Sequence, residues 1–154
     1  MEISVLLHNV RSSHNVGSIF RTADAAGAGN IFLTGYTPTP KDRFGRKQKD
    51  IAKTALGAEE YIDWQYAKDP LSILKESKKE GWRIVGVEQD PRSNLYTELK
   101  LSGKVIFVFG NEVRGLSKQL REECDDLIEI PMKGQKESLN VSVAVGIVLF
   151  NALK

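Results

Sequence analysis

The chain has 154 residues, 41% of them hydrophobic, which is enough for one domain with a sizeable core and too few for two ordinary domains. Lys and Arg number 22 against 20 Asp and Glu, so the net charge of +2 does not by itself indicate a polyanion partner, and any nucleic-acid surface must be a local patch. The single cysteine, Cys124, excludes an internal disulfide framework and a cysteine-rich zinc site, and it is compatible with a reducing compartment.

Short runs rich in Val, Ile and Phe alternate with helix-like segments along the chain. This alternation predicts an α/β fold, with a parallel sheet and helices on its faces. The predicted strands are residues 3–7, 31–34, 61–64, 83–88, 105–109 and 127–130. The sequence has no internal repeat and no linker-like stretch, so we expect a single domain over residues 1–154.

Two helices are predicted between these strands. The first has apolar residues at the i, i+3, i+4, i+7 spacing of an amphipathic helix. These residues are Val16, Ile19, Phe20, Ala23 and Ala26, with Gly27 and Gly29 as terminators. The second begins with Asp69 as its N-cap and Pro70 in its first turn, and it ends at Gly81.

Residues 140–154 are apolar nearly all round, and their length favours a helix over a strand. A helix that is apolar on every side needs cover on every side, so we expect a second subunit to supply part of that cover. The apolar run is shorter than the roughly 18 to 20 residues that cross a bilayer, and residues 1–9 are typical of a strand, not of a signal peptide. We therefore expect a cytoplasmic homodimer with no membrane segment.

Three polar or glycine-bearing segments follow predicted strands, at residues 9–21, 110–117 and 131–140. In open α/β sheets, ligands bind beyond the carboxyl ends of the strands, where loops supply backbone groups on a rigid base. Functional residues concentrate in such loops. We therefore expect the site to be built from these three segments.

Arg21 stands out in the first segment because it lies one helical turn beyond Gly17. Helical side chains lean toward the N-terminus, so Arg21 is predicted to pass over Gly17, whose missing side chain leaves room for it. This would aim the guanidinium at the mouth of the helix. The alternative is that Asn15 is a helix cap and Arg21 is a surface or ion-pairing residue.

In the second segment, Gly110 permits close approach of the backbone to a ligand, although an ordinary turn with Ser117 as N-cap is an equal alternative. In the third segment, Ser138, Asn140 and Ser142 gather at the mouth of one helix. One of the three caps that helix, and three exceed what a cap requires. Both segments are therefore candidates for ligand binding.

The segment 35–49 is polar and contains proline, so it is predicted to be an exposed loop. Tyr36 and Phe44 lie among its basic residues, a composition that suits phosphate contact and base stacking, with a solvated charged loop as the alternative. The basic residues are Lys41, Arg43, Arg46, Lys47 and Lys49.

Other types of site find no support in the sequence. The two histidines, His8 and His14, are not at zinc-ligand spacing, so we expect no metal. A complete dinucleotide fingerprint, a P-loop and a Gly-x-Ser-x-Gly elbow are all absent from the sequence.

The three segments, in this order, resemble the signature motifs of the SpoU/TrmH branch of the SPOUT RNA methyltransferases. The matching residues are Asn15-x-Gly17-x-x-x-Arg21-x-Ala23, Gly110-Asn111-Glu112-x-x-Gly115-Leu116, and Ile130-Pro131-Met132 through Ser138-Leu139-Asn140-Val141-Ser142-x-Ala144. Residues 53–58 are also similar to a segment of this branch. Many relatives carry an additional RNA-binding domain, and the resemblance leads us to expect that this chain is the catalytic domain alone.

The resemblance implies a Rossmann-like, mostly parallel sheet with helices on both faces and a deep C-terminal trefoil knot. It also implies a homodimer, with the apolar C-terminal helix near the interface, and an S-adenosylmethionine (AdoMet) site in the knot, with no metal. By analogy, five residues line the cofactor pocket: Glu88, Gly110, Ile130, Met132 and Leu139. The implied activity is methylation of a ribose 2'-hydroxyl in tRNA or rRNA.

A ribose 2'-hydroxyl is a poor nucleophile, so such a site must orient it and assist the loss of its proton. The resemblance assigns this role to Arg21; whether the guanidinium takes the proton or stabilises the developing alkoxide stays open. Arg11 and the basic residues of segment 35–49 are expected to bind RNA. The residues expected to orient Arg21, the ribose and the motif loops are Asn15, Glu112, Ser138 and Asn140.

Two readings compete with this one. A non-catalytic RNA-binding module or a pseudoenzyme would keep the same fold, but the intact motifs argue against both. A receiver-type regulatory domain would need an acidic cluster at the strand ends, which the sequence does not show.

Overall fold

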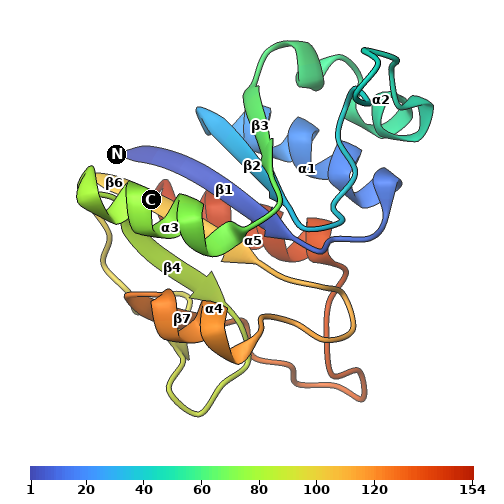
Figure 1. The fold of residues 1–154 in the computed structure, drawn as a ribbon. Helices are drawn as coiled ribbons and strands as arrows, with labels where there is room; N and C mark the ends of the chain where they lie inside the picture. Colours follow the sequence, from blue (N-terminus) through green and yellow to red (C-terminus); the bar gives the residue numbers. More distant parts are fainter.

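In the computed structural model, which describes residues 1–154, seven strands form one sheet in which every neighbouring pair is parallel (Figure 1). Their order across the sheet is β3-β2-β1-β6-β4-β7-β5. The strands are β1 (Glu2–His8), β2 (Asn30–Thr34), β3 (Asp63–Ala67), β4 (Arg83–Val87), β5 (Asn94–Leu95), β6 (Lys104–Phe109) and β7 (Asp126–Glu129). The predicted α/β class is confirmed.

Helices cover both faces of the sheet (Figure 1). Helices α1, α2 and α5 lie on one face, and α3 and α4 lie on the other. The helices are α1 (Ser13–Ala26), α2 (Lys49–Ala55), α3 (Pro70–Lys79), α4 (Lys118–Glu123) and α5 (Val141–Ala152), with one 3₁₀ turn, η1 (Ala58–Glu60). None of these helices is long and apolar enough to cross a membrane.

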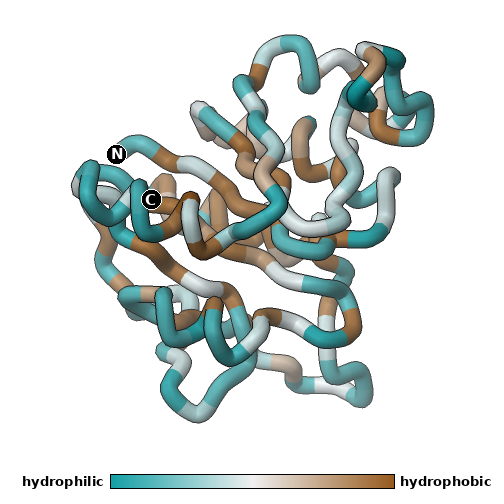
Figure 2. Tube along the Cα trace, viewed as in Figure 1, coloured by the Kyte–Doolittle hydropathy of each residue, from teal (hydrophilic) through white to brown (hydrophobic).

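Strand β6 shows how the core forms on both faces. Because successive residues of a strand point to opposite faces, Phe107 joins the hydrophobic cluster under α1 and α5, and Ile106 joins the cluster under α3 and α4. The central strands carry many of the hydrophobic segments of the trace (Figure 2). A strand buried on both faces gives the apolar run that predicted this element.

Helix α1 is confirmed, and its cap is Ser12, whose hydroxyl accepts from the backbone N–H of Asn15. The helix ends at Gly27, which has a left-handed conformation (φ 79°) that suits glycine. Helix α3 is confirmed with its predicted cap, because the Asp69 carboxylate accepts from the backbone N–H of Leu71. The helix predicted at the C-terminus is α5, and Asn140 caps it by accepting from the backbone N–H of Ser142.

The third strand lies two residues later than predicted. Tyr61 and Ile62 are apolar and β-favouring, but the chain is still completing the 3₁₀ turn there, since the backbone N–H of Ile62 donates to the carbonyl of Ala58 at 3.1 Å. The two-residue β5 and the seven-residue α2 were not predicted. Helix α2 starts after Gln48, which makes no side-chain cap, so the sequence carries no start signal there.

Because all the strands are parallel, their carboxyl ends lie at one edge of the sheet. The order of the strands reverses between β1 and β6, which makes this the topological switch point where α/β sheets bind ligands. After β7 the chain returns to pack α5 against α1. This arrangement is consistent with the trefoil knot that the resemblance implies.

Candidate functional site

A cavity of about 390 Å³ lies beyond the carboxyl ends of β4, β6 and β7, beside the start of α5. Its size is in the range of small-molecule sites. The lining residues are Val87, Glu88, Gln89, Phe109, Gly110, Asn111, Glu112, Val113, Gly115, Glu129, Ile130, Met132, Glu137, Ser138, Leu139, Val141 and Ala144. All five residues predicted to bind a cofactor are therefore brought together here, along with Glu112 and Ser138.

The charge of this lining is one-sided. Four glutamates contribute to it, and no lysine, arginine or histidine does. Carboxylates close to a ligand favour a positively charged group and oppose a polyphosphate. The glutamates are Glu88, Glu112, Glu129 and Glu137.

Glu88 holds the loop that follows β6. One of its carboxylate oxygens accepts from the backbone N–H of Leu116 at 2.6 Å, and the other accepts from the backbone N–H of Gln89 at 3.0 Å. Gly115 has φ 66°, and a Cβ built on it would lie 2.1 Å from the Glu88 carboxylate. The loop can therefore close on Glu88 only because residue 115 has no side chain. Glu88 thus positions the loop that forms one wall of the cavity.

Glu112 ties the cavity wall to the loop before α1. Its carboxylate accepts from the backbone N–H of Arg11 at 3.0 Å and of Ser12 at 3.2 Å. Two segments that lie about 100 residues apart in the sequence are thereby fixed to each other. Glu112 therefore holds the loop before α1, and its role toward the ribose stays a prediction.

Gly110 has a structural reason to be glycine. A Cβ built there would lie 2.5 Å from the carbonyl oxygen of Gly115, so the loop's own backbone occupies the space that the missing side chain leaves. Close approach of the Gly110 backbone to a ligand stays a prediction. Gly110 still lines the cavity, and it shapes the wall by letting residues 110–115 fold back on themselves.

Asn15 and Asn140 meet at the mouth of α5. The Asn140 side-chain amide donates to Oδ1 of Asn15 at 3.1 Å, which joins the start of α1 to the start of α5. Asn15 is free for this contact because Ser12, and not Asn15, caps α1. Ser138 lies two residues before Asn140 and contributes to the cavity lining. The first and third segments therefore converge as predicted.

Arg21 is the residue whose predicted placement is wrong. A Cβ built on Gly17 would lie 2.0 Å from Oγ1 of Thr54 and 2.3 Å from the carbonyl oxygen of Ile51, so α2 fills the space through which Arg21 was expected to pass. Arg21 is exposed on α1 and does not line the cavity. The glycine serves the close packing of α1 on α2, and Thr54 belongs to the segment 53–58 that carried part of the resemblance.

The two histidines lie in separate surroundings. Nδ1 of His8 lies 2.9 Å from the hydroxyl of Thr34, and burial lowers the pKa of the His8 imidazole. His14 is exposed and lies 3.8 Å from the carboxylate of Asp50. No group of three or more His, Cys, Asp or Glu residues is arranged to hold a metal ion.

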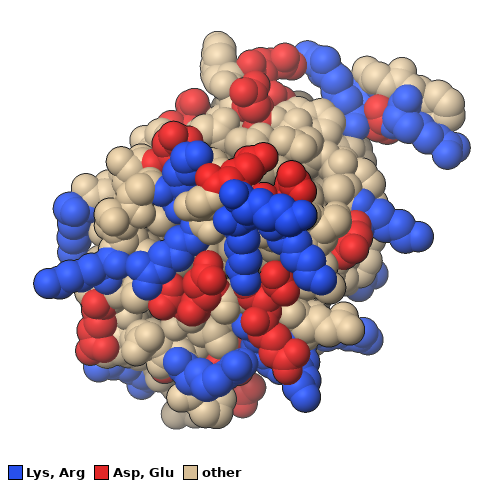
Figure 3. Space-filling view, turned by 60° about the vertical axis from the view of Figure 1, so that its left-hand side comes forward, with Lys and Arg blue, Asp and Glu red and all other residues tan.

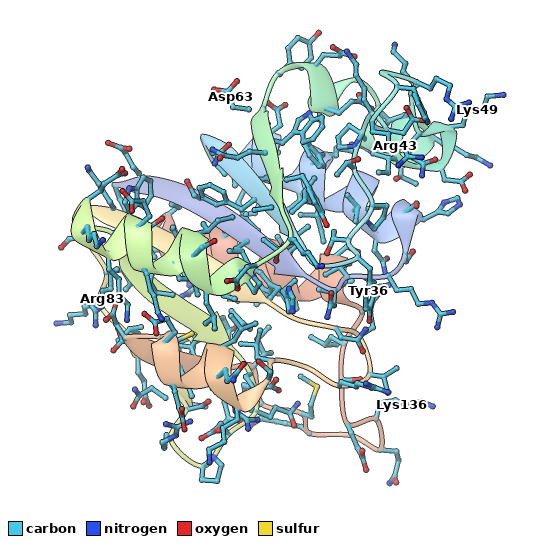
Figure 4. The ribbon with its side chains drawn as sticks, viewed as in Figure 1. Tyr36, Arg43, Lys49, Asp63, Arg83 and Lys136 are labelled. Atoms are coloured by element: carbon cyan, nitrogen blue, oxygen red, sulfur yellow. The ribbon has the colours of Figure 1, made fainter.

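The basic residues of segment 35–49 lie around the start of α2, where Arg43 and Lys49 project (Figure 4). None of the five lines the cavity. Two of the five are paired with acids: Arg46 lies 2.8 Å from the Asp42 carboxylate, and Lys47 lies 3.8 Å from that of Glu60. The face drawn in Figure 3 shows basic and acidic side chains intermixed. The loop is exposed as predicted, but part of its charge is neutralised locally.

Asn111 lines the cavity and had no predicted role. Nδ2 of Asn111 donates to the backbone carbonyl of Asn9 at 3.0 Å and to the phenol oxygen of Tyr36 at 2.8 Å. Because Asn111 lies inside one of the motifs that resemble the family, the sequence could have indicated that it belongs to the site. The contact with Tyr36 crosses 75 residues, and nothing in the sequence indicates it.

Comparison with known proteins agrees with the resemblance found in the sequence motifs. Residues 2–150 match the model of the SpoU rRNA methylase family. The 23S rRNA (guanosine-2'-O-)-methyltransferase RlmB of Vibrio vulnificus is 36% identical over 150 residues, which are 97% of this chain and 58% of that protein. RlmB of Photobacterium profundum is 37% identical, and the match again covers 97% of this chain and 58% of that protein. The chain thus spans somewhat more than half the length of these curated relatives.

Solved structures agree in fold. The AdoMet-bound rRNA methyltransferase of Sinorhizobium meliloti has a TM-score of 0.88 and 33% identity, covering 98% of this chain and 55% of that one. The TrmH/SpoU tRNA modifying enzyme of A. aeolicus has a TM-score of 0.85 and 30% identity, covering 98% of this chain and 73% of that one.

Proposed function

We propose that this chain, which belongs to the SpoU rRNA methylase family, transfers a methyl group from AdoMet to a ribose 2'-hydroxyl of RNA. The observation that carries the proposal is the acidic cavity beyond the carboxyl ends of β4, β6 and β7, with four glutamates and no basic residue in its lining. AdoMet has a sulfonium and an ammonium group against one carboxylate, so its net charge is positive. It therefore suits this lining, which a dinucleotide or a nucleoside triphosphate would not.

The residues of the cavity divide into two groups under this proposal. Ile130, Met132 and Leu139 supply the apolar part of the lining, which suits an adenosine moiety. Glu88 and Glu112 hold the loops that form its walls through backbone amides. When bound, the cofactor supplies an electrophilic methyl group whose departure leaves a neutral sulfur, so the leaving group needs no acid. The remaining task for the protein is to orient the hydroxyl and remove its proton.

We assign that task to Arg21, supported by Asn15, Ser138 and Asn140. The two asparagines are already joined at the mouth of α5, beside the cavity. Arg21 lies outside the cavity lining of its own subunit, so it acts on RNA that reaches the outer side of α1, or across a subunit interface. Because Arg21 does not line the cavity, we propose that it acts on the RNA and not on the cofactor.

We further propose that the chain forms a homodimer through α5. Buried residues of α5 face the sheet and α1, but an apolar stripe on the other side stays exposed. Val143, Phe150 and Leu153 in this stripe are 49%, 49% and 50% exposed. An apolar stripe of this kind on a central helix is typical of a subunit contact. The apolar residues on nearly every side of residues 140–154 in the sequence have the same explanation.

Ribosomal RNA is the first substrate to test, because the curated relatives are named 23S rRNA methyltransferases. The protein is incubated with methyl-labelled AdoMet and unmodified total rRNA or tRNA, and the RNA is then digested to nucleosides. We expect label in 2'-O-methylnucleosides. Label in a methylated base would show a different acceptor, and cofactor and RNA binding without any transfer would favour the non-catalytic alternative. Residues 1–154 as one catalytic domain, and a cytoplasmic location, remain part of the same proposal.

A further inference from the structure

We propose that residues 41–47 form a rigid hairpin that presents Phe44 as a stacking surface for an unpaired base of the RNA. The inference rests on the proposed function, which supplies the RNA, and it adds which kind of nucleotide this surface takes. The evidence comes from the closure of the hairpin, the exposure of its tip and the charges around it.

The hairpin is closed by its own backbone. Lys41 and Lys47 form an antiparallel bridge, and the backbone N–H of Asp42 donates to the carbonyl of Arg46 at 2.9 Å. Gly45 at the turn has φ 77°, a conformation that favours glycine. Below the bridge, the backbone N–H of Gln48 donates to the carbonyl of Pro40 at 2.9 Å. The tip is thus held in one shape before any ligand arrives.

Asp42 fixes the tip from inside. Its carboxylate accepts from the backbone N–H groups of Phe44 and Arg46 at 2.8 and 3.0 Å, and from Nε of Arg46 at 2.8 Å. These bonds favour the charged form, so the pKa of Asp42 lies below its usual range, chiefly because of the Arg46 backbone N–H. One acidic side chain therefore fixes two residues of the tip through three hydrogen bonds.

This arrangement holds the Phe44 ring in solvent at the tip of the hairpin. Its side chain is 66% exposed, and it contributes to neither hydrophobic cluster. The guanidinium carbons of Arg43 and Arg46 lie 4.9 and 5.0 Å from the centre of its ring. An aromatic ring held in solvent by a rigid loop and flanked by cations is the arrangement that single-stranded nucleic acids use for stacking.

The charges around the ring are suited to an RNA strand. Arg46 is bound to Asp42 and Lys47 is paired with Glu60, whereas Lys41, Arg43 and Lys49 make no ion pair with an acidic side chain. The unpaired cations are available for phosphates next to the stacked base. A base within a duplex has both faces covered by its neighbours, so Phe44 can stack only on a base in a loop, a bulge or a single strand.

The test compares Phe44→Leu with Tyr61→Leu, a matched control at an aromatic residue that is 78% exposed but lies outside the hairpin. Binding of a single-stranded RNA oligonucleotide and of a duplex of the same length is measured at several salt concentrations. We expect Phe44→Leu to raise the dissociation constant for the single strand about tenfold, the scale of one lost stacking contact. The salt dependence should stay unchanged because no phosphate contact is removed. The control and the duplex should show no change.

A second variant, Phe44→Trp, should keep wild-type affinity for the single strand, because a larger aromatic ring still stacks. Equal affinity of the wild type and Phe44→Leu for the single strand would overturn the inference and leave the methyltransferase proposal intact. An equal loss for strand and duplex would also overturn it. A wild type that binds RNA and shows the Phe44 effect but transfers no methyl group would overturn the proposed function alone.

Discussion

Nδ2 of Asn111 lies 2.8 Å from the phenol oxygen of Tyr36, so the wall of the acidic cavity is joined directly to the segment that leads to the hairpin. Tyr36 lies between the sheet edge and the residues around α2 (Figure 4). Its backbone N–H also donates to Oδ1 of Asn9 at 3.0 Å. The proposed cofactor site and the proposed RNA surface therefore share one hydrogen-bonded connection.

Tyr36→Phe tests this connection by removing only the phenol oxygen. We expect the fold and the affinity for AdoMet to be kept, and kcat/KM for RNA to fall about three- to tenfold, the scale of one hydrogen bond. Steady-state methylation at varied RNA concentration measures the change. Tyr61→Phe is the control, because Tyr61 makes no side-chain hydrogen bond with the rest of the chain. Equal kinetics for both variants would show that the connection carries no function.

The elements that the sequence predicted best are those with local signals. Helix α3 has its cap, proline and glycine within thirteen residues, and β6 is a continuous apolar run. The gathering of loops at one sheet edge followed from parallel topology alone. These features need no knowledge of which distant residues meet.

The parts that the sequence could not give depend on distant contacts. Helix geometry predicted that the side chain of Arg21 passes over Gly17 on the same helix. In the structure, Gly17 instead packs against Thr54 on α2, which lies 37 positions further along the chain. The hold of Glu88 on the backbone of Leu116 likewise joins two loops with no local signal. The family resemblance identified these residues as important, and helix geometry assigned Gly17 to the wrong neighbour.

Gly17→Ala should therefore destabilise the protein. Its Cβ would lie 2.3 Å from the backbone carbonyl oxygen of Ile51, which cannot move aside as a side chain can. We expect a loss of about 1–3 kcal/mol in the free energy of unfolding, measured by urea denaturation, as for overpacking in other cores. Gly29→Ala is the control, because a Cβ there has no atom within 4 Å. A Gly17→Ala protein as stable as this control would mean that α2 packs less closely on α1.

Cys124 should be unreactive in the folded protein. Burial raises the pKa of its thiol to about 12, so at pH 8 only about one molecule in ten thousand carries the reactive thiolate. Iodoacetamide labelling should be slow in buffer and fast in denaturing urea, where the thiol regains its ordinary pKa. Because the folded pKa is the higher one, the contribution of this thiol to stability is complete at neutral pH and is lost as pH rises toward 12. Fast labelling of the native protein would rule out this burial.

Phe150→Glu should convert the proposed dimer into monomers. The change places a charge in the middle of the exposed stripe of α5, and burying an unpaired charge at an interface is strongly unfavourable. Phe150 is about half exposed within one subunit, so the folded subunit should tolerate the substitution. Sedimentation at micromolar concentration measures the effect, with Tyr61→Glu as a control that should stay dimeric. A monomeric wild type would remove the proposal that α5 is a subunit contact.

Arg21→Ala should separate catalysis from cofactor binding. Arg21 does not line the cavity, so calorimetry should give the affinity of the wild type for AdoMet. Ribose methylation should fall about a hundredfold or more, the scale of losing a positioned proton-transfer group.

Arg21→Lys then distinguishes two roles, because lysine keeps the charge but loses the planar fork that can hold a hydroxyl and a phosphate together. If charge alone matters, lysine should restore much of the rate, and if the fork matters, it should not. Single-turnover rates at saturating RNA and cofactor decide between them, and a near-normal rate for Arg21→Ala would show that the catalytic assignment is wrong while the family assignment stands.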